Sequence, residues 1–436
     1  MSPAGSSAAR LTQRRVLGTW WPLAASWLLM GVELPMLSAI IARLADPEQN
    51  LAAFGGIVFP VSLLIEAPII MMLAASTALS RDRDSFERLR RFAVGSGLLL
   101  SGIHALVAFT PLFDLLVVGL IDPPSEIIEP ARLGMRIMTP WTVMISDRRF
   151  HQGVLIRSGH SRAVGIATLV RFVATMSLLF VGFQSGWIGC AVACAALTGG
   201  VTVEMLFVRR VVAPVVASDL GVPLPGAAPL DLRRLLAFYI PLALTPLLNL
   251  TAQPMGSAAM SRMPQSLNSL AAWPVAFGLI FVLRSVGIAF NEVVVRHAGE
   301  PDARRVLGRF TWMLALACVA LLALVAATPL ADFWFGRVVG LSEELTSLAG
   351  TSLWLGLLLP AMTVYHSFYQ GLLVHSHQTR GVTESVALFL VITILFLWAG
   401  EALGHWPGIW VSLVAFSAGS SVQAAWLARC VRRAGL

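Results

Sequence analysis

Charged side chains that interrupt long apolar stretches are the residues of this sequence that could do chemistry. Glu33 precedes Pro35 by two residues, and Glu66 precedes Pro68 by two residues. A charge near the centre of a bilayer costs at least about 2.5–3.5 kcal/mol, so each carboxylate needs a partner or a water-lined cavity. A proline leaves the helical hydrogen-bond ladder open beside it. We interpret Glu66 as a cavity-facing functional residue, and for Glu33 a structural hydrogen bond to a neighbouring helix is the alternative to a functional role.

The stretches that position these residues dominate the chain. Of 436 residues 57% are hydrophobic and 12% are charged, which excludes an ordinary soluble protein. A helix needs about 20 apolar residues to cross the hydrocarbon core. The sequence therefore predicts an all-α polytopic membrane protein with twelve transmembrane helices, at 16–41, 51–79, 92–120, 133–156, 163–184, 188–208, 234–260, 269–295, 306–333, 347–374, 382–400 and 409–428.

Arginine placement predicts the orientation of these helices. All 31 basic residues are arginines; 22 fall in alternate loops together with both termini, five fall in the other loops, and the remaining four lie inside helices. Basic residues accumulate on the cytoplasmic side. We therefore expect a multi-pass protein of the bacterial inner (plasma) membrane with both termini in the cytoplasm.

The two halves of the chain nearly repeat each other. Prolines, arginines and Gln-Gly pairs recur at an offset of 218 or 219 residues; Pro35 and Pro254, for example, are equivalent. Six helices is an even number, so the repeats run parallel. We predict a cytoplasmic tail at 1–15, an N-lobe at 16–210, a cytoplasmic linker at 211–232 and a C-lobe at 233–436.

The repeat places polar residues at corresponding depths in the two lobes. Offset 219 superposes Ile65 on Arg284, one residue from Glu66, and offset 218 superposes Asp147 on Tyr365 and Arg148 on His366. Polar residues at equivalent positions of both halves are what a central cavity requires. The predicted cavity residues are Arg284, Asp147, Arg148, Arg149, Tyr365, His366, Asn249 and Gln253.

Several of these residues also have a structural interpretation. Asp147 and the two arginines after it could snorkel or pair locally. Asn249 and Gln253 could satisfy backbone groups that nearby prolines leave free. Arg171, Glu204 and Glu384 could form an ion pair within a lobe, or could lie near helix ends.

Short motifs carry a family resemblance. They are RRLLAFYIPLAL, NLAAFG, and the pair QGVLIRSGHSRAVG and QGLLVHSHQTRGVT. The sequence thereby resembles the multidrug/oligosaccharidyl-lipid/polysaccharide (MOP) exporter superfamily, in particular its multidrug and toxin extrusion (MATE) branch. YIPLAL and AQPMGSAAMSR look most like the progressive ankylosis (ANK) transporters. The loop ALSRDRDSFERLRRF lacks the glycines of the major-facilitator signature.

The resemblance implies a secondary exporter that works by alternating access, coupled to H⁺ or Na⁺. MATE-like exporters often bind the coupling cation at an acidic residue on a bent first helix. Glu33 occupies a comparable place, so we expect Glu33 and Glu66 to be the coupling residues and Pro35 and Pro254 to be hinges. The cargo would be a small organic solute or drug, with an anion as one option through Arg284. The alternatives are a flippase for a lipid-linked saccharide or a major-facilitator-type transporter.

Motifs of other function classes do not occur. The sequence has no Walker A, His-Glu-x-x-His, Cys-x-x-Cys or Gly-x-Ser-x-Gly pattern, which argues against an ATPase, a zinc protease or an acyl transferase. We therefore expect no enzyme activity, no metal site and no cofactor besides the coupling ion. The expected partners are a small-molecule substrate and the lipid bilayer, without nucleic acid, and the expected state is a monomer.

Overall fold

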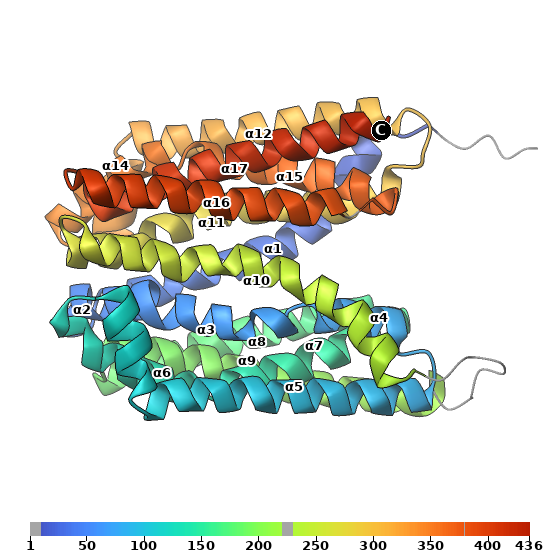
Figure 1. The fold of residues 1–436 in the computed structure, drawn as a ribbon, viewed down its shortest axis with the longest axis horizontal. Coiled ribbons are helices and arrows are strands. Elements are labelled where there is room, and N and C mark those ends of the chain that lie inside the picture. Colours follow the sequence, from blue (N-terminus) through green and yellow to red (C-terminus); the bar gives the residue numbers. More distant parts are fainter. Residues whose placement is uncertain (1–9, 220–229, 379) are drawn as a thin grey trace, which may run out of the picture.

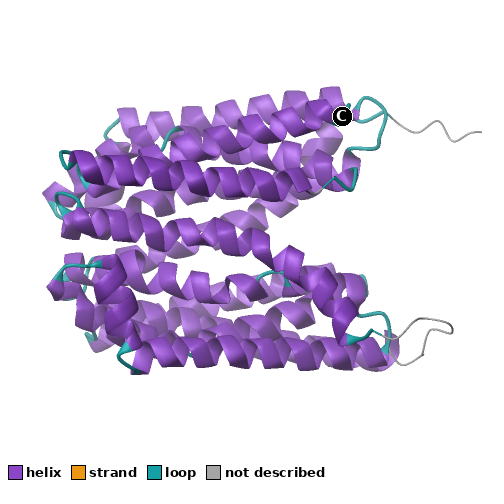
Figure 2. Ribbon diagram, in the orientation of Figure 1, coloured by secondary structure: helices purple, strands orange, loops and turns teal. Residues whose placement is uncertain are grey.

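The computed structural model describes residues 10–219, 230–378 and 380–436. In those residues all regular structure is helical (Figure 2). The first half contains α1 (Gln13–Ile41), α2 (Pro47–Leu51), α3 (Phe59–Glu66), α4 (Met72–Leu79), α5 (Arg83–Phe109), α6 (Ile128–Met138), α7 (Trp141–Arg157), α8 (Ser161–Ser185) and α9 (Gly189–Asp219). The second half contains α10 (Leu232–Arg262), α11 (Ser266–His297), α12 (Ala303–Ala327), α13 (Leu330–Asp332), α14 (Glu343–Leu355), α15 (Leu358–His375), α16 (Arg380–Leu403) and α17 (Gly408–Arg433).

The predicted all-α polytopic fold is confirmed. Within the described ranges ten helices are long and apolar enough to cross a membrane, and α14 with α15, bent by 41°, makes an eleventh candidate. The span expected at 133–156 lies in α6 and α7. Three consecutive charged residues, Asp147, Arg148 and Arg149, make α7 more polar than the other spans.

Side-chain caps explain where several helices begin. Asp82 accepts a hydrogen bond from the backbone N–H of Ser85, and the Ser85 hydroxyl in turn accepts one from the backbone N–H of Asp82, so the two residues form a capping box at the start of α5. The bond from the Ser85 backbone holds the pKa of the Asp82 carboxyl below its usual value. Asp231 caps α10 through the N–H of Arg234. α9 continues to Asp219, so the start of the linker expected at 211–232 is helical, and 220–229 lie outside the described residues.

The repeat in the sequence has a counterpart in the geometry. Gly200 of α9 faces Thr175 of α8, and Gly419 of α17 faces Thr393 of α16 in the same way. Short π-helical segments occur at equivalent places too, η3 (Asp114–Ile121) and η5 (Phe333–Val339). Each lobe therefore has the same scaffold, and differences between the lobes lie in the side chains.

The first helix of each half contacts both lobes (Figure 1). On α1, Trp20 donates a hydrogen bond to the carbonyl of Val286 on α11, 2.9 Å away, whereas Glu33 pairs with Arg171 on α8. On α10, Tyr239 donates to the carbonyl of Pro68, 2.6 Å away, whereas residues nearer its end pack beside α16 and α17. Packing thus crosses the sequence boundary between the predicted lobes at these two helices.

The two bundles separate toward the end of the molecule where α17 ends, here called the terminal side (Figure 1). They meet toward the other end, here called the opposite side. Near the centre Gly55, in the π-helical segment η1 (Ala52–Val58), contacts Pro274 of α11, its equivalent in the repeat. A Cβ atom on Gly55 would stand 2.3 Å from the Cβ of Pro274, so this approach requires glycine.

Candidate central transport site

A cavity of about 400 Å³ lies between the two halves, within the range of small-molecule pockets. Both halves contribute walls to it, from α1, η1, α3, α7, α8, α9, α10 and α11. Its polar lining residues are Glu33, Glu66, Arg148, Arg149, Arg171 and Gln253. Its aromatic lining residues are Trp27, Phe54, Phe59, Trp141, Trp273, Phe277 and Phe281. The cavity therefore combines aromatic walls with charge that comes entirely from the first half.

Glu33 of α1 is fixed by two residues of α8. Thr175 on α8 donates to one carboxylate oxygen at 3.1 Å, and Arg171, one turn earlier on α8, reaches the other at 3.0 Å. The Glu33 side chain is 8% exposed and that of Arg171 10% exposed, so water screens the pair little. Glu33 is therefore a held carboxylate whose main partner is an arginine.

Glu204 on α9 extends this pair into a buried network. Arg148 of α7 donates to Glu204, Gln152 donates to its other oxygen at 2.9 Å, and Arg171 lies 3.5 Å away. Two carboxylates and two guanidinium groups balance in charge, which is the condition under which buried ions are tolerated. The network ties α1, α7, α8 and α9 together, and three of its charged residues form part of the cavity wall.

Glu66 differs from Glu33 because no partner fixes it. It ends α3 just before a tight 3₁₀ turn, η2 (Ala67–Ile69), whose Pro68 has no N–H to donate. The residue is 3% exposed, and within the described part of the chain its Oε2 atom has no hydrogen-bond partner. Glu66 forms none of the ion pairs found there. A buried carboxylate in this state is costly as an anion and is a candidate for binding a proton or cation.

Arg149 is the cationic counterpart of Glu66. It follows Arg148 on α7 and lines the same cavity, yet its Nε atom has no hydrogen-bond partner within the described ranges. The structure therefore gives the cavity one carboxylate and one guanidinium that the buried network does not use.

Arg284 lies outside the central cavity. Its Nε donates to Thr363 on α15 at 2.9 Å, and its guanidinium sits 5.5 Å from the centre of the Phe277 ring. Phe277 and Phe281 on the same helix do line the cavity. The sequence register predicts that Arg284 lies at nearly the same depth as Glu66 in the opposite lobe and lines the cavity; in the described structure it does not line the cavity, and the two residues form no ion pair. Arg284 thus has no carboxylate partner there.

The other predicted residues are distributed around the molecule. Asp147 points to the other face of α7 and pairs with Arg209 at 2.7 Å. Tyr365 stacks on Tyr369, and the His366 ring lies 2.9 Å from the Ser420 carbonyl. Asn249 is exposed on α10.

The two predicted hinge prolines also have different surroundings. Pro35 is buried in α1 beside Gly278 of α11. Pro254 lines an apolar cavity of about 600 Å³ between α3, α5, α10 and α16.

Arg171 and Glu204 are central residues to which the sequence alone gave little weight. The ion pair considered for them forms, whereas Glu384 instead pairs with Arg380 at the surface. The signal in the sequence was a single charge well inside an apolar stretch, at 163–184 for Arg171 and at 188–208 for Glu204.

Two arginines hold the halves together at the opposite side. Arg43, just after α1, donates to the carbonyls of residues 337–339 at the end of η5. Arg262, its equivalent at the end of α10, donates to the carbonyl of Leu120 at the end of η3. Each arginine thus bonds the π-helical segment of the other half. We call these two contacts the arginine latch.

Comparisons with known proteins agree with this fold. No model of a known protein family matches the sequence, and no curated protein matches it. Among solved structures, an inward-facing MATE family transporter of the MOP superfamily is similar over 94% of this chain and 98% of its own, at TM-score 0.73 and 16% identity. The lipid II flippase MurJ in an inward closed conformation follows at TM-score 0.71 and 13% identity, over 94% of this chain and 87% of its own.

A third structure is a MOP superfamily transporter from Pyrococcus furiosus, whose binding pocket is described as having reverse polarity. It matches over all of both chains at TM-score 0.64 and 16% identity. An outward-facing MATE transporter scores 0.62 at 17% identity, over 99% of both chains. This chain therefore shares the fold of these MATE and MurJ structures, the fold that the sequence motifs indicated; the ANK branch stays a prediction.

Proposed function

We propose that this chain with the MATE fold is a secondary exporter, which moves a small organic solute by alternating access in exchange for a proton bound at Glu66. The observation that carries the proposal is the unpaired, buried carboxylate of Glu66 in a cavity between the two halves. The cavity is built from residues of one chain, so a monomer suffices.

The shape of the molecule supports alternating access. The halves are bonded through the arginine latch at the opposite side and separate at the terminal side. The TM-score is higher with an inward-facing MATE transporter, at 0.73, than with an outward-facing one, at 0.62. With both termini in the cytoplasm, as the arginine distribution predicts, the described state is open to the cytoplasm.

The ligands of the cavity favour a proton over Na⁺ as the coupling ion. A sodium ion at Glu66 would share the cavity with Arg148, Arg149 and Arg171. Guanidinium groups have no acceptor atom to offer a metal ion, which needs several oxygen ligands, whereas a proton needs only one carboxylate oxygen. Glu33 is less suited to bind and release a proton in each transport cycle, because Arg171 already neutralises its charge.

Exchange requires that the proton and the cargo exclude each other. Linkage is reciprocal, so a cargo that binds the ionised carboxylate weakens proton binding, and a proton weakens cargo binding. A cargo with a positive or hydrogen-bond-donating group would compete with the proton at Glu66. Aromatic walls such as Trp27, Trp141 and Phe281 suit an aromatic or cationic organic solute.

An organic anion is the second candidate cargo. Arg149 and Arg284, one from each half, have no carboxylate partner in the described structure. Protonation of Glu66 would then strengthen cargo binding, because it removes a negative charge near Arg149. The pH dependence of binding therefore has opposite signs for the two cargo classes. The cavity volume of about 400 Å³ favours either of them over a saccharide on a pyrophosphate lipid.

The test is transport of ethidium, an aromatic cation, into proteoliposomes under an imposed pH gradient. Glu66→Gln should keep the fold, bind ethidium more weakly because the carboxylate charge is gone, and lose the dependence of transport on the gradient. Ser285→Ala, at the equivalent buried position of the second half, is the matched control and should behave as the unmodified protein. Gradient-driven transport by Glu66→Gln at the unmodified rate would contradict the proposal.

A further inference from the structure

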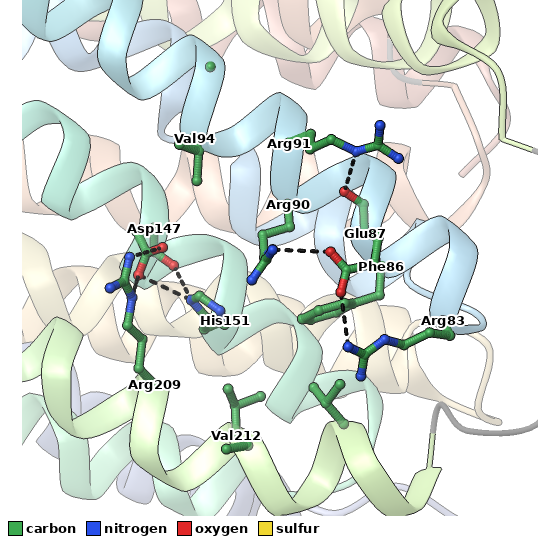
Figure 3. Close-up of a pocket in the computed structure, with 13 residues that line it drawn as sticks. Arg83, Phe86, Glu87, Arg90, Arg91, Val94, Asp147, His151, Arg209 and Val212 are labelled. Carbon is green, nitrogen blue, oxygen red and sulfur yellow. Dashed lines mark hydrogen bonds and ion pairs between the residues drawn. The ribbon is translucent and has the colours of Figure 1, made fainter.

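A cavity larger than the central one lies on the other side of α7. It has a volume of about 820 Å³ and opens between α5, α7 and α9 near the terminal side (Figure 3). Successive residues of α7 divide the two cavities: Asp147 lines this one, and Arg148 and Arg149 line the central one. Nothing in the transport cycle proposed above uses this cavity.

The cavity carries a net positive charge. Its charged lining residues are Arg83, Arg90, Arg91, Arg209, Glu87 and Asp147. Four arginines against two carboxylates leave an excess of two positive charges with histidine neutral. The cavity therefore suits a ligand with one or two negative charges.

The existing ion pairs leave donors free for such a ligand. Glu87 is shared between Arg83 at 3.0 Å and Arg90 at 3.2 Å (Figure 3). Among the described residues, Arg91 bonds only the backbone carbonyl of Glu87, at 3.4 Å. Planar guanidinium groups bind phosphate oxygens in pairs. The free guanidinium donors of α5 therefore suit a ligand that carries a phosphate group.

Apolar surface continues from the cavity along the outside of the bundle. Phe86, Val94, Val212 and Val216 line the cavity between the charges. Beyond it, Leu98 and Leu99 of α5 are 58% and 66% exposed, and Leu206 of α9 is 42% exposed. In a membrane this surface contacts acyl chains, so phosphate-binding and chain-binding surfaces adjoin.

The second half has a cavity at the equivalent place, which supports a ligand at this depth. It measures about 480 Å³, and its charged lining residues among those described are Arg304 and Arg432, with no carboxylate. These two arginines stand where the first half has Phe86 and Ala213. Different residues thus give each cavity an excess of two positive charges.

We propose that the cavity between α5, α7 and α9 binds the phosphate headgroup of an anionic phospholipid from the terminal-side leaflet, with its acyl chains on the exposed leucines. Basic pockets between transmembrane helices on the cytoplasmic side bind anionic headgroups in this way. The lipid bridges α5 and α9, the two helices on either side of α7.

The experiment compares thermal unfolding of the purified full chain in nanodiscs of phosphatidylcholine alone and in nanodiscs that also contain about 20% of the anionic lipid phosphatidylglycerol. Phosphatidylglycerol should raise the midpoint of the unmodified protein, and Arg90→Gln with Arg91→Gln should lose most of that rise. Arg162→Gln removes an exposed arginine outside the cavity and is the matched control that should keep the rise.

Two further measurements test whether the bound ligand is the lipid: the amount of phosphatidylglycerol retained by the protein, and the effect of inorganic phosphate on the unfolding midpoint. Native mass spectrometry should show phosphatidylglycerol retained at least about threefold more by the unmodified protein than by the double variant. Inorganic phosphate at the same concentration should leave the midpoint unchanged. An equal rise with inorganic phosphate, or an equal rise in the double variant, would overturn the proposal. If the double variant does not fold, Arg91→Gln alone, which breaks no ion pair, carries the same test.

Discussion

The two halves of the molecule share a scaffold but differ in what they bury. Where Arg171, Thr175 and Glu204 form part of a charged network in the first half, the equivalent residues of the second half are Phe389, Thr393 and Gln423. Glu33 corresponds to Ala252 and Glu66 to Ser285 in the same register.

This contrast shows that helix packing does not require the charges. In the second half α16 and α17 pack in the same way, with Gly419 against Thr393, although Phe389 stands in place of the arginine. Buried ions are seldom worth their desolvation cost for stability alone. We infer that the first half keeps its charges for coupling, and that the second half moves against it as a scaffold.

The largest expected effect comes from breaking the network. Arg171→Phe copies the second half but leaves Glu33 and Glu204 buried without their shared partner. We expect a loss of about 3–5 kcal/mol in the free energy of unfolding, the usual cost of an uncompensated buried charge. The measurement is chemical unfolding of the purified protein in detergent.

A quadruple variant makes the comparison sharper. Arg171→Phe, Glu33→Ala, Glu204→Gln and Arg148→His together copy the second half at all four charged positions of the network, so no buried charge of the network is left without its partner. Its stability should return to within about 1–2 kcal/mol of the unmodified protein. A quadruple variant as unstable as the single one would show that the halves pack by different rules.

A smaller effect is expected from the arginine latch, where the two halves also differ. Arg43 bonds three carbonyls of the second half, whereas Arg262 bonds one carbonyl of the first and lies 3.8 Å from Glu401. Arg43→Ala should raise the fraction open at the opposite side by roughly tenfold, and Arg262→Ala by less. Spin-label distances across the opposite side measure that fraction; an equal response to both would contradict the asymmetry.

The smallest expected effect lies at the start of α1. Glu300, between α11 and α12, accepts hydrogen bonds from His297 and from Arg15 at 2.7 Å each. The His297 bond first, and Arg15 after it, hold the Glu300 pKa below its usual value. A carboxyl whose pKa is lowered on folding contributes stability above its unfolded pKa and loses that contribution as the pH falls through its folded one.

The contact between α1 and the second half should therefore weaken below about pH 4. Hydrogen exchange at the first turns of α1 measures this, with Glu300→Gln as the variant that removes the dependence. Asp302, which contacts Arg10 at 3.7 Å in a mostly exposed pair, offers a matched control. The same exchange rates at pH 7 and pH 4 in the unmodified protein would contradict the assignment.

Much of the fold was predictable because a helix that crosses a membrane requires a long apolar stretch, which can be recognised in the sequence. The repeat at 218 and 219 residues, with Pro35 and Pro254 in register, indicated two equivalent halves. The crossing of α1 and α10 between the lobes was not predictable, since it depends on contacts such as Trp20 with Val286 that no periodicity records.

The candidate site was predictable in part. Glu33, Glu66, Arg148, Arg149 and Gln253 line the central cavity, and each interrupts an apolar stretch. The sequence register predicts that Asp147 and Arg284 also line this cavity, but in the structure they do not. The register gives the depth of a residue in the membrane and not the direction in which its side of the helix faces. Asp147 instead faces Arg209 on the far side of α7.

The central claim is that cargo and a proton compete for Glu66 in the first half. The most direct test counts protons, with a pH indicator, when ethidium binds the purified protein in weakly buffered detergent near neutral pH. We predict release of up to one proton per ethidium bound in the unmodified protein and in Ser285→Ala, and none in Glu66→Gln. The same release from Glu66→Gln, or proton uptake on binding in the unmodified protein, would contradict the account.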